Sequence, residues 1–196
     1  MCEYTRTIED TTSIGVGTLA FAGESQLKSM PLFMNNFRLL LLGVWLGAAI
    51  FFSATVAPAA FGVLRGFQLA NANEIAGAIV TRTLSIVNIS GFAISLFLLA
   101  TAFLVKRRGA SGAGFYLEII LLAMIAILTG ASQWWVSPRM LAIRAALPRP
   151  IDQIARNDPQ RVAFDTLHHY SVALLGIAVL ASLIAFFVMA RQRRKA

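Results

Sequence analysis

Four long apolar runs, separated by short polar segments, dominate the chain. Each run is about 20 residues or longer, the length that an α-helix needs to cross roughly 30 Å of hydrocarbon. The pattern predicts transmembrane helices over residues 37–64, 83–105, 115–136 and 167–190. The predicted fold class is all-α: an integral membrane four-helix bundle with short interfacial helices.

The polar ends of the chain set the predicted domain boundaries. Residues 1–33 are rich in Thr, Ser and Gly, which predicts a disordered tail. Met30 and Met34 stand just before the first apolar run and are alternative translation starts. Residues 34–190 are predicted to form the membrane domain, and residues 191–196 a basic cytoplasmic tail.

The first apolar run has an alternative interpretation as a signal peptide, because Arg38 precedes it and small residues follow. The run is longer than a signal sequence requires, which favours a membrane span. Gly43 and Gly47 form a small-xxx-small pair that predicts close packing against a neighbouring helix. Pro58 is expected to kink the outer end of the span.

The longest polar connection, residues 137–158, predicts a short helix on the membrane surface. Pro138 suits the first turn of such a helix, and Pro148 would end it. Asp158 and Pro159 then form a favourable N-cap and N1 pair for the last long helix.

Composition agrees with a membrane protein. Hydrophobic residues make up 58% of the chain and charged residues 13%, and the mean hydropathy is +0.72. A soluble domain of 196 residues would expose much of that apolar surface to water. The net charge of +8 does not indicate nucleic-acid binding, because no basic stretch is interleaved with exposed aromatic residues.

The basic residues near the span ends predict the orientation. Three adjacent ones, Lys106 to Arg108, separate spans two and three, and four follow residue 190. By the positive-inside rule, both termini are expected in the cytoplasm of a cell with the bundle in its inner membrane. Five arginines between the third and fourth predicted spans weaken the contrast.

Polar side chains within the spans are the candidate site, because burying them in a membrane is costly. The predicted ligand-binding residues lie toward the outer half of the bundle: His168, Ser171, Asn88, Gln133 and Arg82. Two interpretations stay open. The cluster binds a ligand, cation or proton, or its members form interhelical hydrogen bonds that hold the bundle together.

Catalytic and metal chemistry is not expected. The chain has one cysteine, Cys2, and two histidines, His168 and His169, which point about 100° apart on a helix. We therefore expect no metal site, no catalytic residues and no cofactor. A single-ligand contact from His168 to a haem or pigment stays open.

Two segments resemble a known family. Residues 41–64, with Gly47, the Phe51-Phe52 pair and Ala57-Pro58-Ala59, resemble the first helix of a family of four-helix membrane proteins of unknown function. That family includes the transmembrane protein associated with cisplatin resistance. Residues 164–171 are similar to its F-x-x-L-H-x-x-S motif, whereas Leu175 stands where the family often has Asn.

The resemblance implies four spans and an uncharacterised role in small-solute transport or membrane homeostasis. The alternative is an accessory or structural subunit of a larger, energy-converting membrane complex. The expected partners are the lipid bilayer and either further copies of the chain or that complex, with no nucleic acid.

Overall fold

Helices account for every regular element in the described part of the chain. The computed structural model describes residues 33–69, 71–106 and 112–193. Residues 33–51 are helical and continue into η1 (Phe52–Val56) and α2 (Ala57–Gly66). The later elements follow in chain order: α3 (Ala72–Lys106), α4 (Ala113–Ala131), η2 (Ser132–Val136), α5 (Ser137–Ala146), η3 (Ile151–Gln153) and α6 (Pro159–Arg193).

Four of the resulting continuous helices are long and apolar enough to span a membrane: Phe33–Gly66, Ala72–Phe103, Ala113–Ala146 and Pro159–Gln192. The predicted all-α, four-span fold is confirmed. The predicted tail, apart from Phe33, and the basic segments 107–108 and 194–196 lie outside the described residues.

The chain forms two compact units, Met1–Arg38 and Leu39–Ala196. In the first unit, the described residues are the start of a helix in which the Phe33 and Phe37 rings stack with centroids 6.3 Å apart. The bundle described below is the second unit.

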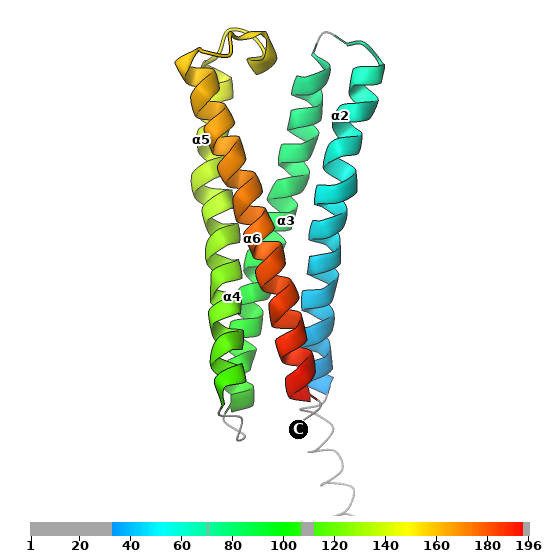
Figure 1. Ribbon diagram of the computed structural model, residues 1–196, viewed down its shortest axis with the longest axis vertical. Helices are drawn as coiled ribbons and strands as arrows, with labels where there is room; N and C mark the ends of the chain where they lie inside the picture. Colours follow the sequence, from blue (N-terminus) through cyan, green and yellow to red (C-terminus); the bar gives the residue numbers. More distant parts are fainter. Residues whose placement is uncertain (1–32, 70, 107–111, 194–196) are drawn as a thin grey trace, which may run out of the picture. The chain divides into compact units, whose positions relative to one another are not determined.

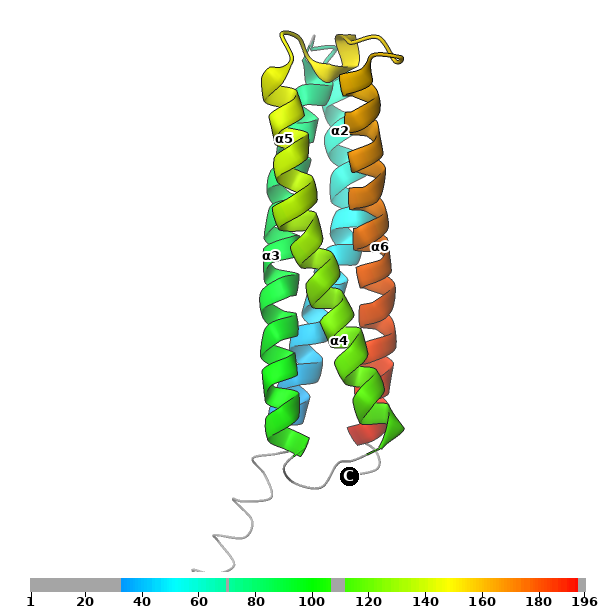
Figure 2. The same cartoon turned by 90° about the vertical axis from the view of Figure 1, so that its left-hand side faces the viewer.

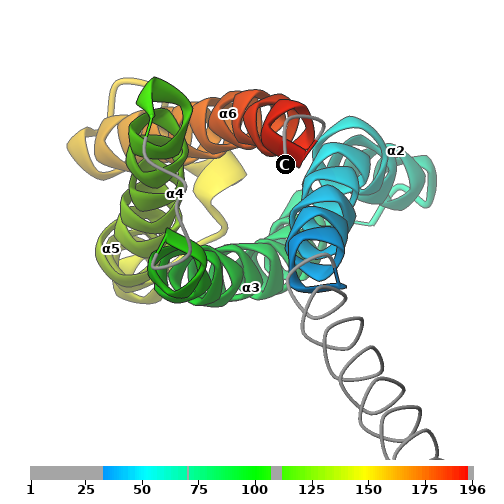
Figure 3. The same cartoon turned by 90° about the horizontal axis from the view of Figure 1, so that it is seen from below.

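Within Leu39–Ala196, successive long helices run in opposite directions and lie beside one another (Figures 1 and 2). Figure 3, along the helices, shows α4 between α3 and α6. The short connections 67–71 and 147–158 lie at the same end of the unit, which we call the connection end. Large apolar side chains are exposed along the outer faces, for example Val44 and Phe51 at 62% and 60% exposed. A lipid environment suits such faces.

The helices extend beyond the predicted spans. α3 begins at Ala72 and α6 at Pro159, where apolar runs alone predicted starts near residues 83 and 167. The first turns of α3 and α6 are polar, and a helix can extend beyond the hydrocarbon of the membrane into water. The separate surface helix predicted near Pro138 is not present: α5 continues α4 through η2 without a break, as part of the third long helix.

Both prolines within the spans follow a π-helical turn. A proline inside a helix has no N–H to donate, and its ring clashes with the carbonyl one turn earlier. η1 ends with the Ala57 N–H donating to the Phe52 carbonyl, and η2 ends with the Ser137 N–H donating to the Ser132 carbonyl. The wider turn accommodates the proline that follows, so each helix continues beyond it.

This likeness between spans one and three extends along their length. Pro138 follows Pro58 by 80 residues, and η2 and α5 repeat the lengths of η1 and α2 at the same interval, 5 and 10 residues. The buried positions agree too. All of those between Leu39 and Gly66 have a buried counterpart 80 residues later: Leu42 and Leu122, Trp45 and Ile125, Leu46 and Ala126, Ala49 and Thr129, Phe52 and Ser132.

Spans two and four are also equivalent. α3 and α6 each contain 35 residues, and α6 starts 87 residues after α3 because the second connection, 147–158, is longer than the first, 67–71. Paired buried positions are Asn88 and Leu175, Gly91 and Ala178, Ser95 and Ser182, Leu98 and Ala185, Ala102 and Met189. Residues 39–106 and 113–193 are therefore two equivalent helical hairpins that run in the same direction.

Only one glycine of the predicted pair packs closely against another helix. A Cβ on Gly43 would lie 3.2 Å from the Phe186 ring, but a Cβ on Gly47 would meet nothing within 4 Å. Gly47 is exposed because the buried face of its helix lies about 100° away, along Leu46. A closer approach occurs at Gly91, where a Cβ would lie 2.6 Å from the Trp45 ring.

Candidate functional site

A cluster of four polar side chains joins α3 to η2 inside the bundle. The Asn88 Nδ2 donates to the Ser132 Oγ at 3.0 Å, and the Gln133 Nε2 donates to the Ser85 Oγ at 3.0 Å. Ser85 and Asn88 are three residues apart on one helix and therefore share a face. Two bonds thus connect one face of α3 to adjacent residues of η2, and we call these four residues the amide–serine cluster.

Two oxygen atoms of this cluster have no partner. The Asn88 Oδ1 and the Gln133 Oε1 are buried and accept no hydrogen bond, although Asn88 is only 1% exposed. A buried acceptor without a donor costs about 1–3 kcal/mol, so native proteins rarely leave one unsatisfied. The cluster therefore presents two free acceptors to the bundle interior.

A backbone carbonyl near the cluster also lacks its usual donor. Pro138 has no N–H, so the carbonyl one turn earlier, in the turn that holds Gln133, receives no helical hydrogen bond from it. π-helical turns of this kind occur frequently at functional sites. The cluster thus combines side-chain acceptors with a locally weakened helix.

The cluster lies near the middle of the helices. Asn88 follows the first residue of α3 by 16 residues, about 24 Å along a helix that is roughly 52 Å long. Its predicted place in the outer half assumed that the span starts near residue 83. Because α3 begins at Ala72, the cluster lies near the middle of the helix rather than close to its start.

The structure does not bring all the predicted site residues together. Asn88 and Gln133 meet in the cluster, whereas the His168 and Arg82 side chains are exposed. Ser171 is buried at 6% exposed, but no hydrogen bond joins it to the cluster. The rings of His168 and His169 lie edge to face, and His169 Nδ1 lies 2.7 Å from the Asp165 carbonyl. Of the five predicted site residues, hydrogen bonds to the cluster are shown only for Asn88 and Gln133.

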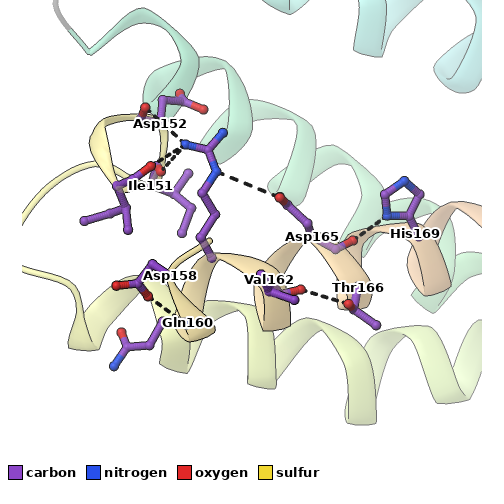
Figure 4. A network of polar contacts seen from close by, with 10 residues as sticks. Ile151, Asp152, Asp158, Gln160, Val162, Asp165, Thr166 and His169 are labelled. Carbon is purple, nitrogen blue, oxygen red and sulfur yellow. Dashed lines mark hydrogen bonds and ion pairs between the residues drawn. The ribbon is translucent and has the colours of Figure 1, made fainter. Parts of the chain in front are cut away.

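A second polar network fixes the long connection at the connection end (Figure 4). Arg161 Nη1 donates to the carbonyls of Ile151, Asp152 and Ile154, the last at 2.6 Å. The Arg161 Nε lies 3.9 Å from an Asp165 carboxylate oxygen, an ion pair between residues one helical turn apart. This arginine anchors η3 to the first turns of α6.

The start of α6 agrees with its predicted cap. The Asp158 carboxylate accepts a hydrogen bond of 2.8 Å from the Gln160 N–H, and Pro159 is the first helical residue. An acidic cap satisfies a free N–H and complements the positive end of the helix dipole.

Other arginines at the connection end lie against aromatic rings. The Arg144 guanidinium is 5.0 Å from the Phe164 ring centroid, and Arg139 is 4.3 Å from that of Trp135. Arg65 donates to the Asn73 Oδ1 at 2.7 Å. Several arginines at this end thus have structural roles. A count of charges in the loops, on which the predicted orientation depends, does not take such roles into account.

Sequence reasoning missed the contact that joins spans one and two. The Trp45 Nε1 donates to the Val87 carbonyl at 2.9 Å, and the same indole packs on Gly91. Ser95 Oγ donates to the carbonyl of Gly91 at 2.7 Å. A glycine in the middle of an apolar helix, with a tryptophan at similar depth in the preceding helix, was the available signal.

Comparison with known proteins yields one family. The model of a domain of unknown function, DUF4149, matches residues 40–148, which include the first three spans and α5 and end before α6. No curated protein and no solved structure matches the chain. By a match over more than half of its length, this four-helix membrane protein belongs to the DUF4149 family.

Proposed function

We propose that this protein binds a small polar solute at the amide–serine cluster and carries it across the membrane, alone or as part of a carrier. The observation behind the proposal is the pair of buried free acceptors, Asn88 Oδ1 and Gln133 Oε1. A solute that donates hydrogen bonds would satisfy both atoms. No reaction is proposed, and the function needs no cofactor.

The place of the cluster suits a carrier. Transporters built from repeated units bind their substrates near the middle of the membrane, at the interface between the repeats. Here Asn88 belongs to the first hairpin and Ser132 to the second, and their hydrogen bond crosses between the two. The cluster thus lies near the middle of the helices and at the interface between the two hairpins.

The proposed setting follows from charge and size. We place the protein in the cell's inner membrane with both termini in the cytoplasm and the connection end outside. Four helices leave little room for a path, so a carrier of this size is expected to work as a homo-oligomer. The resemblance to the cisplatin-resistance-associated family adds the expectation of a role in transport or membrane homeostasis.

Cysteine accessibility tests the proposal. In a Cys2→Ser background, Ser85→Cys reports on the cluster, and Ser95→Cys is a matched control, buried farther along α3 at 1% exposed. A membrane-impermeant thiol reagent added from the connection end is expected to modify the first variant much faster than the second. Equal protection of both cysteines would contradict a path from solution to the cluster.

A specific observation favours the accessory-subunit alternative. Gly47 lies on an exposed apolar face beside Val44 and Phe51, where an added Cβ would meet nothing within 4 Å. Small residues on such a face let another helix approach closely. Purification in a mild detergent tests this function: stoichiometric partner proteins on the column support it, and a chain that runs alone or with its own copies opposes it.

The visible absorption spectrum of that purified protein tests the expected absence of a cofactor. His168 is exposed on α6 and is the position from which a single axial bond to haem or a pigment would be made. A featureless visible spectrum is expected. An absorption band that disappears in His168→Ala would overturn the expectation.

A further inference from the structure

The two hairpins differ at the amide–serine cluster. The counterpart of Asn88 is Leu175, 87 residues later, and the counterpart of Ser132 is Phe52, 80 residues earlier. Both counterparts are buried, at 8% and 5% exposed, and both belong to the hydrophobic core. The same structural positions are therefore polar on one side of the bundle and apolar on the other.

This difference bears on why the cluster is polar. One other equivalent pair keeps its chemistry: Ser95 and Ser182 are both buried, and each donates to the carbonyl four residues earlier at 2.7 Å. Replacing a hydrogen-bonded pair by apolar groups of similar shape is nearly neutral or stabilising. Leu175 and Phe52 are buried at the counterpart positions, which argues that the helices can pack without the polar side chains of Asn88 and Ser132.

The atoms left free define the chemistry of the ligand. Asn88 and Gln133 each donate an amide N–H to a serine hydroxyl. Their side-chain carbonyl oxygens, which accept hydrogen bonds, have no donor. None of the four side chains in the cluster is ionisable at neutral pH. A charged ligand would lose its hydration without gaining a countercharge there, which is costly in a membrane interior.

The charges at the connection end add an independent argument. Seven arginines and four acidic residues lie between residues 65 and 165 on that side of the chain: Arg65, Arg82, Arg139, Arg144, Arg149, Arg156, Arg161, Glu74, Asp152, Asp158 and Asp165. The excess of positive charge repels cations and leaves neutral molecules unaffected, as basic residues do in pores that exclude cations.

We propose that the amide–serine cluster selects small neutral solutes that donate hydrogen bonds, such as polyols and amides, and excludes monovalent cations. This inference rests on the proposed function. The cluster's carbonyl oxygens accept from the hydroxyl or amide hydrogens of the solute. Selection follows from the absence of a carboxylate in the cluster and from the basic connection end.

Solute flux into proteoliposomes that contain the full chain tests the proposal, with glycerol and urea as neutral probes and sodium as the cation. Glycerol and urea are expected to enter faster than into protein-free liposomes, and sodium is not. Asn88→Leu combined with Ser132→Ala should lower the protein-dependent flux by about tenfold or more, because at least one hydrogen bond to the solute is lost. Ser182→Ala, a buried serine outside the cluster, is the matched control and should keep the flux.

Each remaining outcome is decisive. Sodium flux that the double variant abolishes would retain the proposed function and overturn the neutral class. No flux of any probe, together with a protected Ser85→Cys, would overturn both proposals. If the double variant fails to fold, Gln133→Leu replaces it, since that side chain is only half-buried. Undiminished glycerol flux in folded Gln133→Leu would overturn the selection mechanism.

Discussion

The bundle has two equivalent pairs of positions, each with one residue from either hairpin, and different side chains occupy them. In the first interface, Asn88 on α3 meets Ser132 on η2 through a hydrogen bond of 3.0 Å. At the equivalent positions, Leu175 on α6 and Phe52 on η1 are buried in the hydrophobic core. Helix lengths, π-helical turns and prolines are nevertheless matched.

The difference separates what the fold requires from what the site requires. The fold requires a buried side chain at each of these positions. At these positions, polar side chains occur only in the amide–serine cluster, where the Asn88 and Gln133 oxygens are left without donors. An apolar pair would avoid that free-energy cost. The comparison predicts that apolar truncations reduce stability more than changes in the polar cluster do.

The largest effect is expected for Leu175→Ala. Removing a buried leucine side chain leaves a cavity in the core and lowers the free energy of unfolding by about 2–4 kcal/mol. The measurement is reversible unfolding in mixed micelles, with Asn88→Ala as the matched variant in the other hairpin. Equal losses in the two variants would break the comparison, because the polar position would then matter as much for stability.

Gly91→Ala is expected to follow. The new Cβ would lie 2.6 Å from the Trp45 ring, so the indole and its hydrogen bond to the Val87 carbonyl must shift, at a cost of about 1–3 kcal/mol. Gly47→Ala is the control, because its Cβ meets nothing within 4 Å. Thermal unfolding of the two variants compares them. A drop for Gly47→Ala would indicate that an oligomer contact covers that face.

A smaller effect is expected for Arg161→Met, which removes the anchor of the longer connection. Three carbonyls lose their shared donor, so the connection 147–158 loosens by about 1–2 kcal/mol while the membrane helices keep their stability. Hydrogen exchange should show faster exchange in 147–158 and no change in 67–71, its counterpart in the first hairpin. Exchange that rises equally in both connections would contradict a local role.

The smallest effect is expected for Asn88→Leu, which gives the first interface the residue of the second. The unfolding free energy should change by less than about 1 kcal/mol, since interhelical hydrogen bonds in membranes average about 0.6 kcal/mol. The same unfolding assay measures it, beside the conservative core change Leu175→Ile. A loss of several kcal/mol would show that the bundle depends on the polar cluster, and the argument for a ligand would fail.

Much of the fold was predictable because a membrane imposes a simple rule on the sequence. Runs of about 20 apolar residues must be helices, since their backbone groups find no other partners in lipid. The polar cap of α6 was predictable from the adjacent Asp158 and Pro159. Helix starts were less predictable, because polar residues, among them Asn73, Glu74 and Arg82, interrupt the apolar pattern where α3 begins.

The candidate site was predicted in part. Asn88 and Gln133 stood out because polar side chains are costly within spans, and the structure joins them through two serines. His168 stood out for the same reason, yet its side chain faces outward. Apolar lipid-facing and core-facing residues look alike in a membrane sequence, so the rotation of each helix could not be predicted from hydropathy.

By itself, the sequence determined that this protein is a four-helix membrane protein, because helix formation in lipid depends on local composition. Only the tertiary structure decided which residues meet: Trp45 with Gly91, Asn88 with Ser132, and Arg161 with the η3 carbonyls. It also revealed the two equivalent hairpins, since their likeness lies in π-helical turns and burial rather than in shared residues. Contacts between helices depend on rotation and depth, which long-range packing sets.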